Sequence, residues 1–424
     1  MVISRNSLAV SLKMSFGDEG QASGGQEFKD VKSEILLLIA VDALFGFAIG
    51  FSSPSVAPLI VALGVSITFV GQAQTIGALG ATFLRLPAGV LMDRIGRKPF
   101  ILLGGLVTLF GFFSYSMATY WILLGAGITL VTLDYAIRGM ACYASIGDAA
   151  KTGGLGRIFS IDLGVTETAA TLAPLLGGYA ATTLAVPSRF IFATSAGLIV
   201  AALIVVTVAY RPEPRRRLKL EPSGSWRSLI RAERRILPLL IVVVLDAFAW
   251  RISFPFWTLY IFKQMRATQE QLGIALAIAA GIPALTGLTL GSKLDKVGRR
   301  PFMAASEWSA IGAFIPLLVG WRPEFAYISA IFWGLVYSLW VPALNAYIVE
   351  HFGREKFGQT SGTMALASGM ASVASPALGG WMWDNISPSA PFVLTLFLAV
   401  AVGFVIWFRI KEPGEMPPRL TITV

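Results

Sequence analysis

Long runs of apolar residues, separated by short polar segments, recur along the whole 424-residue chain. Each run is about 20 residues long, enough for a helix to cross roughly 30 Å of hydrocarbon. Lipid cannot satisfy backbone polar groups, and the alternating pattern of a barrel strand is absent, so we expect helices. The pattern predicts an all-α membrane protein with twelve spans: Ile35–Leu59, Phe69–Leu91, Phe100–Ala118, Trp121–Ile146, Phe159–Ala181, Phe190–Tyr210, Ile236–Phe262, Leu272–Leu290, Phe302–Val319, Phe325–Val349, Gly358–Trp383 and Phe392–Ile410.

The second part of the chain repeats the first at a spacing of 202 residues. GVLMDRIGRKPF, which begins at Gly89, realigns with GSKLDKVGRRPF, which begins at Gly291. APLLGG, from Ala173, realigns with SPALGG, from Ser375. Because one spacing relates both pairs, we predict two pseudo-symmetric halves of six helices, residues 35–210 and 236–410. Residues 1–34 and 411–424 are expected to be cytoplasmic tails, and residues 211–235 a cytoplasmic linker.

Composition supports a membrane protein and changes the meaning of the net charge. Hydrophobic residues make up 55% of the chain and charged residues only 14%, against about 25% charged in a soluble domain. The net charge of +10 could suggest nucleic acid, but most Lys and Arg residues fall in the tails, the linker and the loops of one side. That distribution is the positive-inside pattern. We therefore expect a multi-pass plasma-membrane protein with both termini in the cytoplasm and no nucleic-acid partner.

The residues that usually bind metals or form disulfides are scarce. Cys142 is the single cysteine and His351 the single histidine of the chain. No disulfide, zinc cluster or two-histidine haem site can be built from them. We expect no metal, no cofactor and no enzymatic activity.

The repeated segment from Gly89 resembles motif A of the major facilitator superfamily, GxxxDRxGR followed by a basic residue. The resemblance covers the whole chain. It implies a secondary transporter that acts by alternating access, in which the motif helps to lock the inner ends of the two halves together. The inner-gate residues implied in this way are Gly89, Asp93, Arg94, Gly96, Arg97 and Asp148, with Gly291, Asp295, Arg299 and Glu350 as their counterparts. Ordinary positive-inside charge with incidental partners is the alternative.

The two glycines of motif A also have a local physical interpretation, because glycine permits close helix approach and tight turns. The PxxGG segments resemble a degenerate motif C, which is associated with antiporters. Their proline and glycines are expected to bend and thin the fifth helix of each half for close packing. These residues are Pro174, Gly177 and Gly178, and Pro376, Gly379 and Gly380.

Ionisable residues inside the predicted spans are the main candidates for a transport site, since each costs about 2.5–3.5 kcal/mol on insertion scales. Asp134 and Arg138 are four residues apart and can pair on one helix face. Asp42 and Asp246 occupy similar places in the first and seventh spans, where they could carry a proton or bind a cationic group. Glu167 is a further candidate for proton coupling. A self-satisfied structural pair is the alternative for Asp134 and Arg138, and helix-packing salt bridges are the alternative for Asp42 and Asp246.

Two other groups of residues are less decisive. Arg251 is expected to meet substrate or a neighbouring helix, and Arg85 to be structural. Asp162 and Glu307 lie within two turns of the cytoplasmic side, so we expect them to reach water. Trp333, Tyr337 and Trp340 share one helix face with Leu344 and Tyr347. In a cavity that face would suit an apolar, aromatic or cationic ligand, whereas against lipid or another helix it would be packing.

The sequence favours a small-solute transporter coupled to protons and functional as a monomer. A proton-coupled exporter of amphipathic or drug-like compounds is the leading hypothesis. An uptake symporter or uniporter for a metabolite is the alternative within transport, because Arg138 and Arg251 would suit an anionic substrate. A non-transporting sensor or a membrane enzyme on the same fold belongs to a different class, and the chain has neither a nucleophile motif nor a sizeable soluble domain to support it.

Overall fold

A computed structural model describes residues 25–149, 155–211, 236–352 and 357–412. Within these ranges every element is helical. The predicted tails and linker lie mostly outside the described residues. In chain order the elements are α2 (Gly25–Ala62), α3 (Ile67–Ile95), α4 (Lys98–Ser116), α5 (Trp121–Asp134), η1 (Tyr135–Gly139), α6 (Met140–Ala149), α7 (Leu155–Thr182), α8 (Ser188–Ala209), α10 (Ile236–Ser253), η2 (Phe254–Phe256), α11 (Trp257–Lys263), α12 (Gln269–Val297), α13 (Arg300–Val319), α14 (Phe325–Phe352), α15 (Phe357–Ser372), α16 (Ser375–Asn385) and α17 (Ala390–Arg409).

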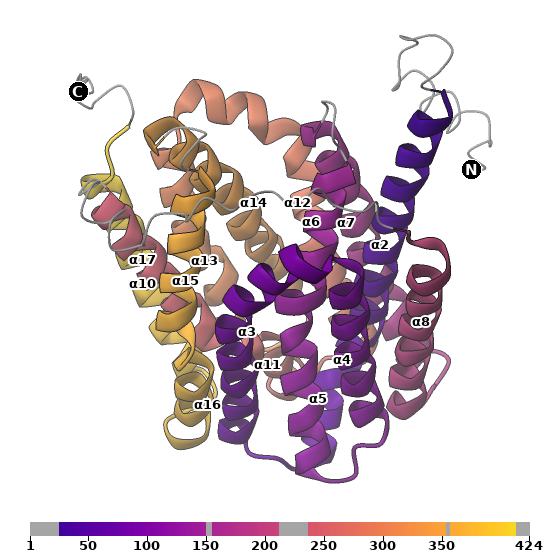
Figure 1. Cartoon of the computed structure of the whole chain (residues 1–424). Coiled ribbons are helices and arrows are strands. Elements are labelled where there is room, and N and C mark those ends of the chain that lie inside the picture. Colours follow the sequence, from indigo (N-terminus) through magenta and orange to yellow (C-terminus); the bar gives the residue numbers. More distant parts are fainter. Residues whose placement is uncertain (1–24, 150–154, 212–235, 353–356, 413–424) are drawn as a thin grey trace, which may run out of the picture.

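Each of the twelve predicted spans coincides with one helix or with a run of consecutive helices in the described residues. Eight of them are long and apolar enough to cross a membrane, or nine if the two parts of the bent helix α3 are counted as one span. The bend in α3 measures 49° and falls at Pro87, where proline removes a backbone hydrogen bond. The helices stand side by side as one bundle (Figure 1). The chain is therefore an all-α, multi-pass membrane protein.

Many large apolar side chains lie on the surface of this bundle. Phe83, Phe397 and Phe408 are 66%, 69% and 75% exposed. Water would oppose so much apolar surface, whereas lipid tails accept it. Phe45, Phe112 and other fully buried side chains pack between the helices instead.

The first contact between the two halves joins α3 to α16 at one end of the bundle. The backbone N–H and the hydroxyl of Thr68 donate to the Asp384 carboxylate at 2.7 and 2.8 Å. A Cβ atom at Gly71 would collide with the Pro376 carbonyl group, and one at Gly380 would collide with the backbone at the start of α3. Glycine is therefore required for this close backbone approach.

The second contact joins α7 to α12 and likewise combines a hydrogen bond with close backbone approach at glycines. The backbone N–H of Glu270 donates to the Thr182 hydroxyl at 3.0 Å. A Cβ atom at Gly273 would collide with the Pro174 carbonyl group, and one at Gly178 would come within 2.9 Å of the Glu270 Cα atom. Each residue here lies 202 positions from its counterpart in the first contact, so the sequence repeat becomes a pair of equivalent contacts.

We call these two contacts together the clasp: Thr68, Gly71, Pro376, Gly380 and Asp384 with Thr182, Gly178, Pro174, Gly273 and Glu270. The clasp joins the halves at the end of the bundle opposite the start of α2 and the end of α17 (Figure 1). The remaining glycine of each PxxGG segment packs inside its own half, Gly177 against Phe51 and Gly379 against Ile252. The structure thus places all six PxxGG residues at helix contacts.

Candidate functional site

A buried ion pair lies inside the N-terminal half, on α5 and the π-helical turn η1. The Arg138 guanidinium donates to both carboxylate oxygens of Asp134, each at 2.8 Å. The Thr108 hydroxyl donates to Asp134 at 2.6 Å. Asp134 and Arg138 are 3% and 5% exposed. Two parallel charge-assisted bonds fix the geometry of this pair and offset the cost of burying it.

Asp42 on α2 contacts the same arginine and is more exposed than Asp134. Its carboxylate accepts a hydrogen bond from Arg138 at 2.5 Å, and its side chain is 24% exposed. The Phe45 ring lies 4.2 Å from the guanidinium carbon, within cation–π range. One guanidinium thus lies between two carboxylates. We call Asp42, Asp134 and Arg138 the arginine network, and Asp42 is its accessible member.

The backbone around Arg138 explains how so large a side chain fits. A Cβ atom at Gly104 of α4 would lie 2.5 Å from the Arg138 backbone nitrogen, so only glycine leaves enough space there. The π-helical turn Tyr135–Gly139 inserts an extra residue into the helix, as is common at functional sites. The contact between Asp42 and Arg138 joins residues 96 apart in the sequence. Sequence spacing alone could not reveal that contact.

Two further acids of the N-terminal half lie on α7. Asp162 is 6% exposed, and its Oδ1 atom has no hydrogen-bond partner among the described residues. It interacts electrostatically with Asp42. The prediction that Asp162 reaches water is therefore wrong, because neighbouring helices cover it. Glu167, one turn further along α7, is half-buried.

Two acids meet in the C-terminal half. Glu307 on α13 is 0% exposed, so the prediction that it reaches water is also wrong. The Trp250 indole N–H donates to Glu307 Oε2 at 3.2 Å. Asp246, on α10 with Trp250, interacts electrostatically with Glu307. We call Asp246 and Glu307 the acid pair.

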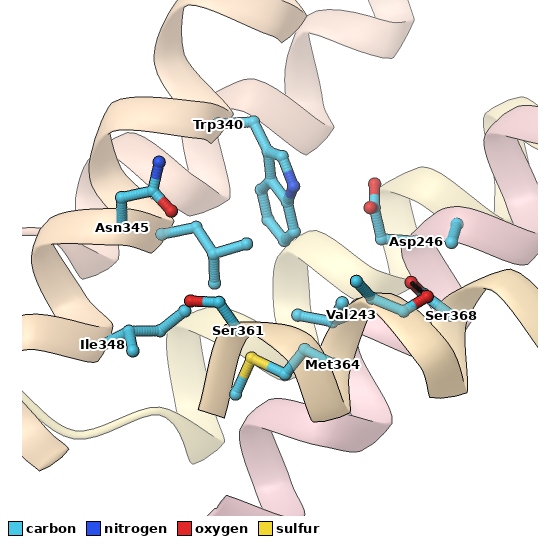
Figure 2. A pocket seen from close by; sticks show the side chains of 11 residues that line it. Val243, Asp246, Trp340, Asn345, Ile348, Ser361, Met364 and Ser368 are labelled. Atoms are coloured by element: carbon cyan, nitrogen blue, oxygen red, sulfur yellow. Dashed lines mark hydrogen bonds between the residues drawn. The ribbon is translucent and has the colours of Figure 1, made fainter. Parts of the chain in front are cut away.

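Asp246, one member of the acid pair, borders a cavity of about 260 Å³. Figure 2 shows the side chains of Asp246 and Trp340 on the wall of this cavity. The cavity lies between α10, α14 and α15, and its lining combines apolar side chains with a few polar groups, as small-molecule sites do. The lining residues are Val243, Asp246, Ala247, Trp340, Leu344, Asn345, Ile348, Ser361, Met364, Ala365 and Ser368.

The aromatic residues of α14 divide between different surroundings. Trp333 packs among the rings of Trp250, Phe314 and other aromatic side chains. Tyr337 is 56% exposed, whereas Trp340 lines the cavity. The single aromatic face expected from the spacing is therefore not one ligand surface, and only its Trp340 and Leu344 part reaches the cavity.

Arg251 of α10 is exposed and interacts electrostatically with Arg85 of α3. These two cations come from different halves. Two positive charges therefore lie near each other where the halves meet.

Several of the predicted inner-gate residues have described contacts within their own half. Arg97 pairs with Asp93 at 3.3 Å, and Lys98 donates to the carbonyl groups of Thr207 and Tyr210 at the end of α8. Arg94 is exposed. Gly96 has φ +95°, a backbone conformation that favours glycine. The side chain of Asp148 lies outside the described residues.

The second copy of the motif behaves similarly. Arg299 forms an ion pair with Glu350, and Gly298 has φ +102°. The surroundings of Gly291 and Asp295 lie outside the described part of the chain. One local interpretation is wrong, since a Cβ atom at Gly89 would meet no described atom within 4 Å. Close helix approach therefore does not explain Gly89.

Comparisons with known proteins agree with this architecture. The family model for the Major Facilitator Superfamily matches residues 38–245 and 239–422. The multidrug resistance protein MdtG of Dickeya zeae is 23% identical over 251 residues, which are 58% of this chain and 61% of that protein. The proton-coupled antiporter flippase LtaA of Staphylococcus haemolyticus is 21% identical over 406 residues, 91% of this chain and 97% of that protein.

Solved structures share the fold. The nucleoside transporter NupG superposes with a TM-score of 0.69 at 15% identity, covering 89% of this chain and 99% of that one. A D-xylose-proton symporter superposes with a TM-score of 0.66 at 14% identity, covering 90% and 99%. The two matches of the family model cover nearly the whole chain and carry the motif copies that begin at Gly89 and Gly291. The chain therefore belongs to the Major Facilitator Superfamily and is a membrane transporter, not an enzyme.

Proposed function

We propose that this chain is a proton-coupled secondary transporter that exports amphipathic or drug-like compounds by alternating access. In this proposal residues 35–210 and 236–410 form two six-helix halves that rock about a central site. Residues 211–235 form a cytoplasmic linker between them. Both termini lie on the cytoplasmic side of the plasma membrane, and one chain is sufficient for transport.

The proposed movement is supported by the position of the clasp. The clasp joins the halves at one end of the bundle, whereas the described motif-A contacts, Asp93 with Arg97 and Arg299 with Glu350, each stay within one half. A state of this kind is closed at the clasp end. In the opposite state the motif-A residues, with Asp148 and Asp295, would join the other ends of the halves as the inner gate.

Coupling to protons rests on one observation: half-buried carboxyl groups of both halves reach accessible space within the spans. Asp42 is the accessible member of the arginine network, and Asp246 borders the cavity. Buried acids in transmembrane helices commonly mark proton or substrate pathways. The names of LtaA, a proton-coupled antiporter flippase, and of MdtG, a multidrug resistance protein, favour export.

An uptake symporter or uniporter for an anionic metabolite is the second candidate. Its specific support is the proximity of Arg85 and Arg251, which belong to different halves. The fold shared with a nucleoside transporter and a D-xylose-proton symporter is compatible with either direction of transport.

Reconstitution into liposomes with an imposed pH gradient tests the proposal. A panel of cationic dyes, including ethidium, and of small carboxylates would be screened for flux and for proton movement in the opposite direction. We expect dye flux that the gradient accelerates and that Asp42→Asn, Asp134→Asn or Asp246→Asn weakens. Flux that neither the gradient nor these three variants alter would remove proton coupling from the proposal.

A further inference from the structure

Residues that correspond in the 202-residue repeat differ in type around the acids of the two halves. Position 340 lies 202 residues after position 138, so Trp340 stands where the first half has Arg138. Ala310 stands in place of Thr108, and Val336 in place of Asp134. The C-terminal half thus lacks the guanidinium and the hydroxyl that stabilise charge in the arginine network. It nevertheless contains two acids within its spans, the half-buried Asp246 and the fully buried Glu307.

Few hydrogen-bond donors contact the acid pair that could stabilise two negative charges in the described structure. Glu307 is fully buried, and the hydrogen bond from Trp250 reaches only its Oε2 atom. The other group that Glu307 interacts with is the carboxyl group of Asp246. Adjacent carboxylates in an apolar surrounding cannot both ionise cheaply, and a single shared proton removes the repulsion.

Most charged groups on the helices around the pair have other partners in the described part of the chain. The helices packed against α10 and α13 are α14, α15, α16 and α17. Besides Asp246 and Glu307, the charged or titratable groups of these helices include Arg300 over the Trp407 ring, Glu350 bonded to Arg299, His351 stacked on Tyr347 and Asp384 in the clasp. The others are Arg251, which interacts electrostatically with Arg85, Arg409 at the end of α17, and the tyrosines Tyr327, Tyr337 and Tyr347 of α14. The described electrostatic partners of Glu307 are Asp246 and Trp250. A proton is therefore the positive charge that the site can take.

We propose that Asp246 and Glu307 form a proton-binding site in which the two carboxyl groups share one proton. Asp246, on the cavity wall, takes up the proton from water and releases it to water when a cationic solute binds in the cavity. Glu307, behind it, holds the proton away from water. The inference deepens the proposed function by assigning the proton to the C-terminal half and by adding Glu307, which the sequence alone placed near water.

Carbodiimide labelling of the full-length wild-type protein tests this site without a substrate and without a variant. Dicyclohexylcarbodiimide adds to protonated carboxyl groups in apolar surroundings, and peptide mass spectrometry locates the adduct. At neutral pH we expect labelling of Glu307 or Asp246 severalfold above that of Asp134, whose two carboxylate oxygens are bonded to Arg138. The labelling should fall in alkaline buffer. Absence of label from both members of the acid pair would overturn the proposal.

Infrared spectroscopy of the substrate-free protein gives a second, chemical readout. The wild-type spectrum minus the Glu307→Gln spectrum should contain a carboxylic acid C=O band at neutral pH, because the variant leaves Asp246 alone and ionised. Glu324→Gln, which alters an exposed loop carboxylate, is the matched control and should give no such band. A difference spectrum without the band for Glu307→Gln contradicts proton sharing. Because neither experiment involves transport, a positive result combined with flux that ignores the pH gradient would reject proton coupling while leaving the site itself intact.

Discussion

The two halves of this transporter are alike where backbones meet and different where charges are buried. At the clasp, Gly71 and Gly273 make the same contact with a proline carbonyl group. In the interior, Arg138 neutralises acids in the first half, whereas Trp340 occupies the equivalent position in the second. The backbone contact constrains its residues to small size in both copies. The interior positions have no such shared constraint. Arg138 contacts the acids of the first half, and we propose that a proton takes the corresponding role in the second.

The largest expected effect comes from removing the arginine. Arg138→Leu leaves Asp134 buried without its cation, which should cost about 3–5 kcal/mol of stability. Thermal unfolding of the purified protein in detergent would measure this loss. Trp340→Leu, the equivalent change in the C-terminal half, is the matched control and should lower the melting temperature much less. Equal decreases in melting temperature would contradict the expectation that Arg138 stabilises a buried charge and Trp340 does not.

A smaller loss of stability, of equal size at the two contacts of the clasp, is expected when their glycines are replaced. Gly71→Val and Gly273→Val each insert a side chain against a proline carbonyl group, and overpacking costs about 1–3 kcal/mol. Either variant should shift the population toward states open at the clasp end. Distances between spin labels at the two sides of the clasp would report the shift. If one variant opened the clasp and the other did not, the proposed equivalence of the two contacts would be wrong.

The smallest effect is expected from the polar part of the clasp. Asp384→Asn weakens the two hydrogen bonds from Thr68, which lie in exposed surroundings, and should cost no more than about 1 kcal/mol. The same spin-label distances should shift in the same direction as for Gly71→Val, but less. A larger shift for Asp384→Asn than for Gly71→Val would show that hydrogen bonds, rather than backbone approach, hold the clasp.

Local patterns predicted the local parts of the structure. Apolar runs predicted the helices, and the i,i+4 spacing placed Asp134 beside Arg138. The repeat indicated equivalent glycines at positions 178 and 380, and both make close contacts. The helices and the ion pair depend on residues close together in the sequence. The equivalent glycines follow from comparing the two copies of the repeat.

Features that depend on how the helices are rotated and packed could not be predicted. Glu307 lies close to a helix end in sequence, yet it is buried. Helices α14 and α17 pack against α13, and Trp250 of α10 donates a hydrogen bond to Glu307. Asp42 bonds to Arg138 only because α2 packs against the fourth span. For Gly89, motif membership suggested close packing that the described structure does not contain.

The most direct test of the account is ethidium exchange in liposomes that contain wild-type protein or Glu307→Gln, with and without an imposed pH gradient. If the acid pair carries the coupled proton, the variant should still exchange ethidium across the membrane but should lose the acceleration that the gradient gives to the wild type. Glu324→Gln should behave as the wild type does. Acceleration of the Glu307→Gln protein equal to that of the wild type would contradict the claim that the C-terminal half holds the coupled proton.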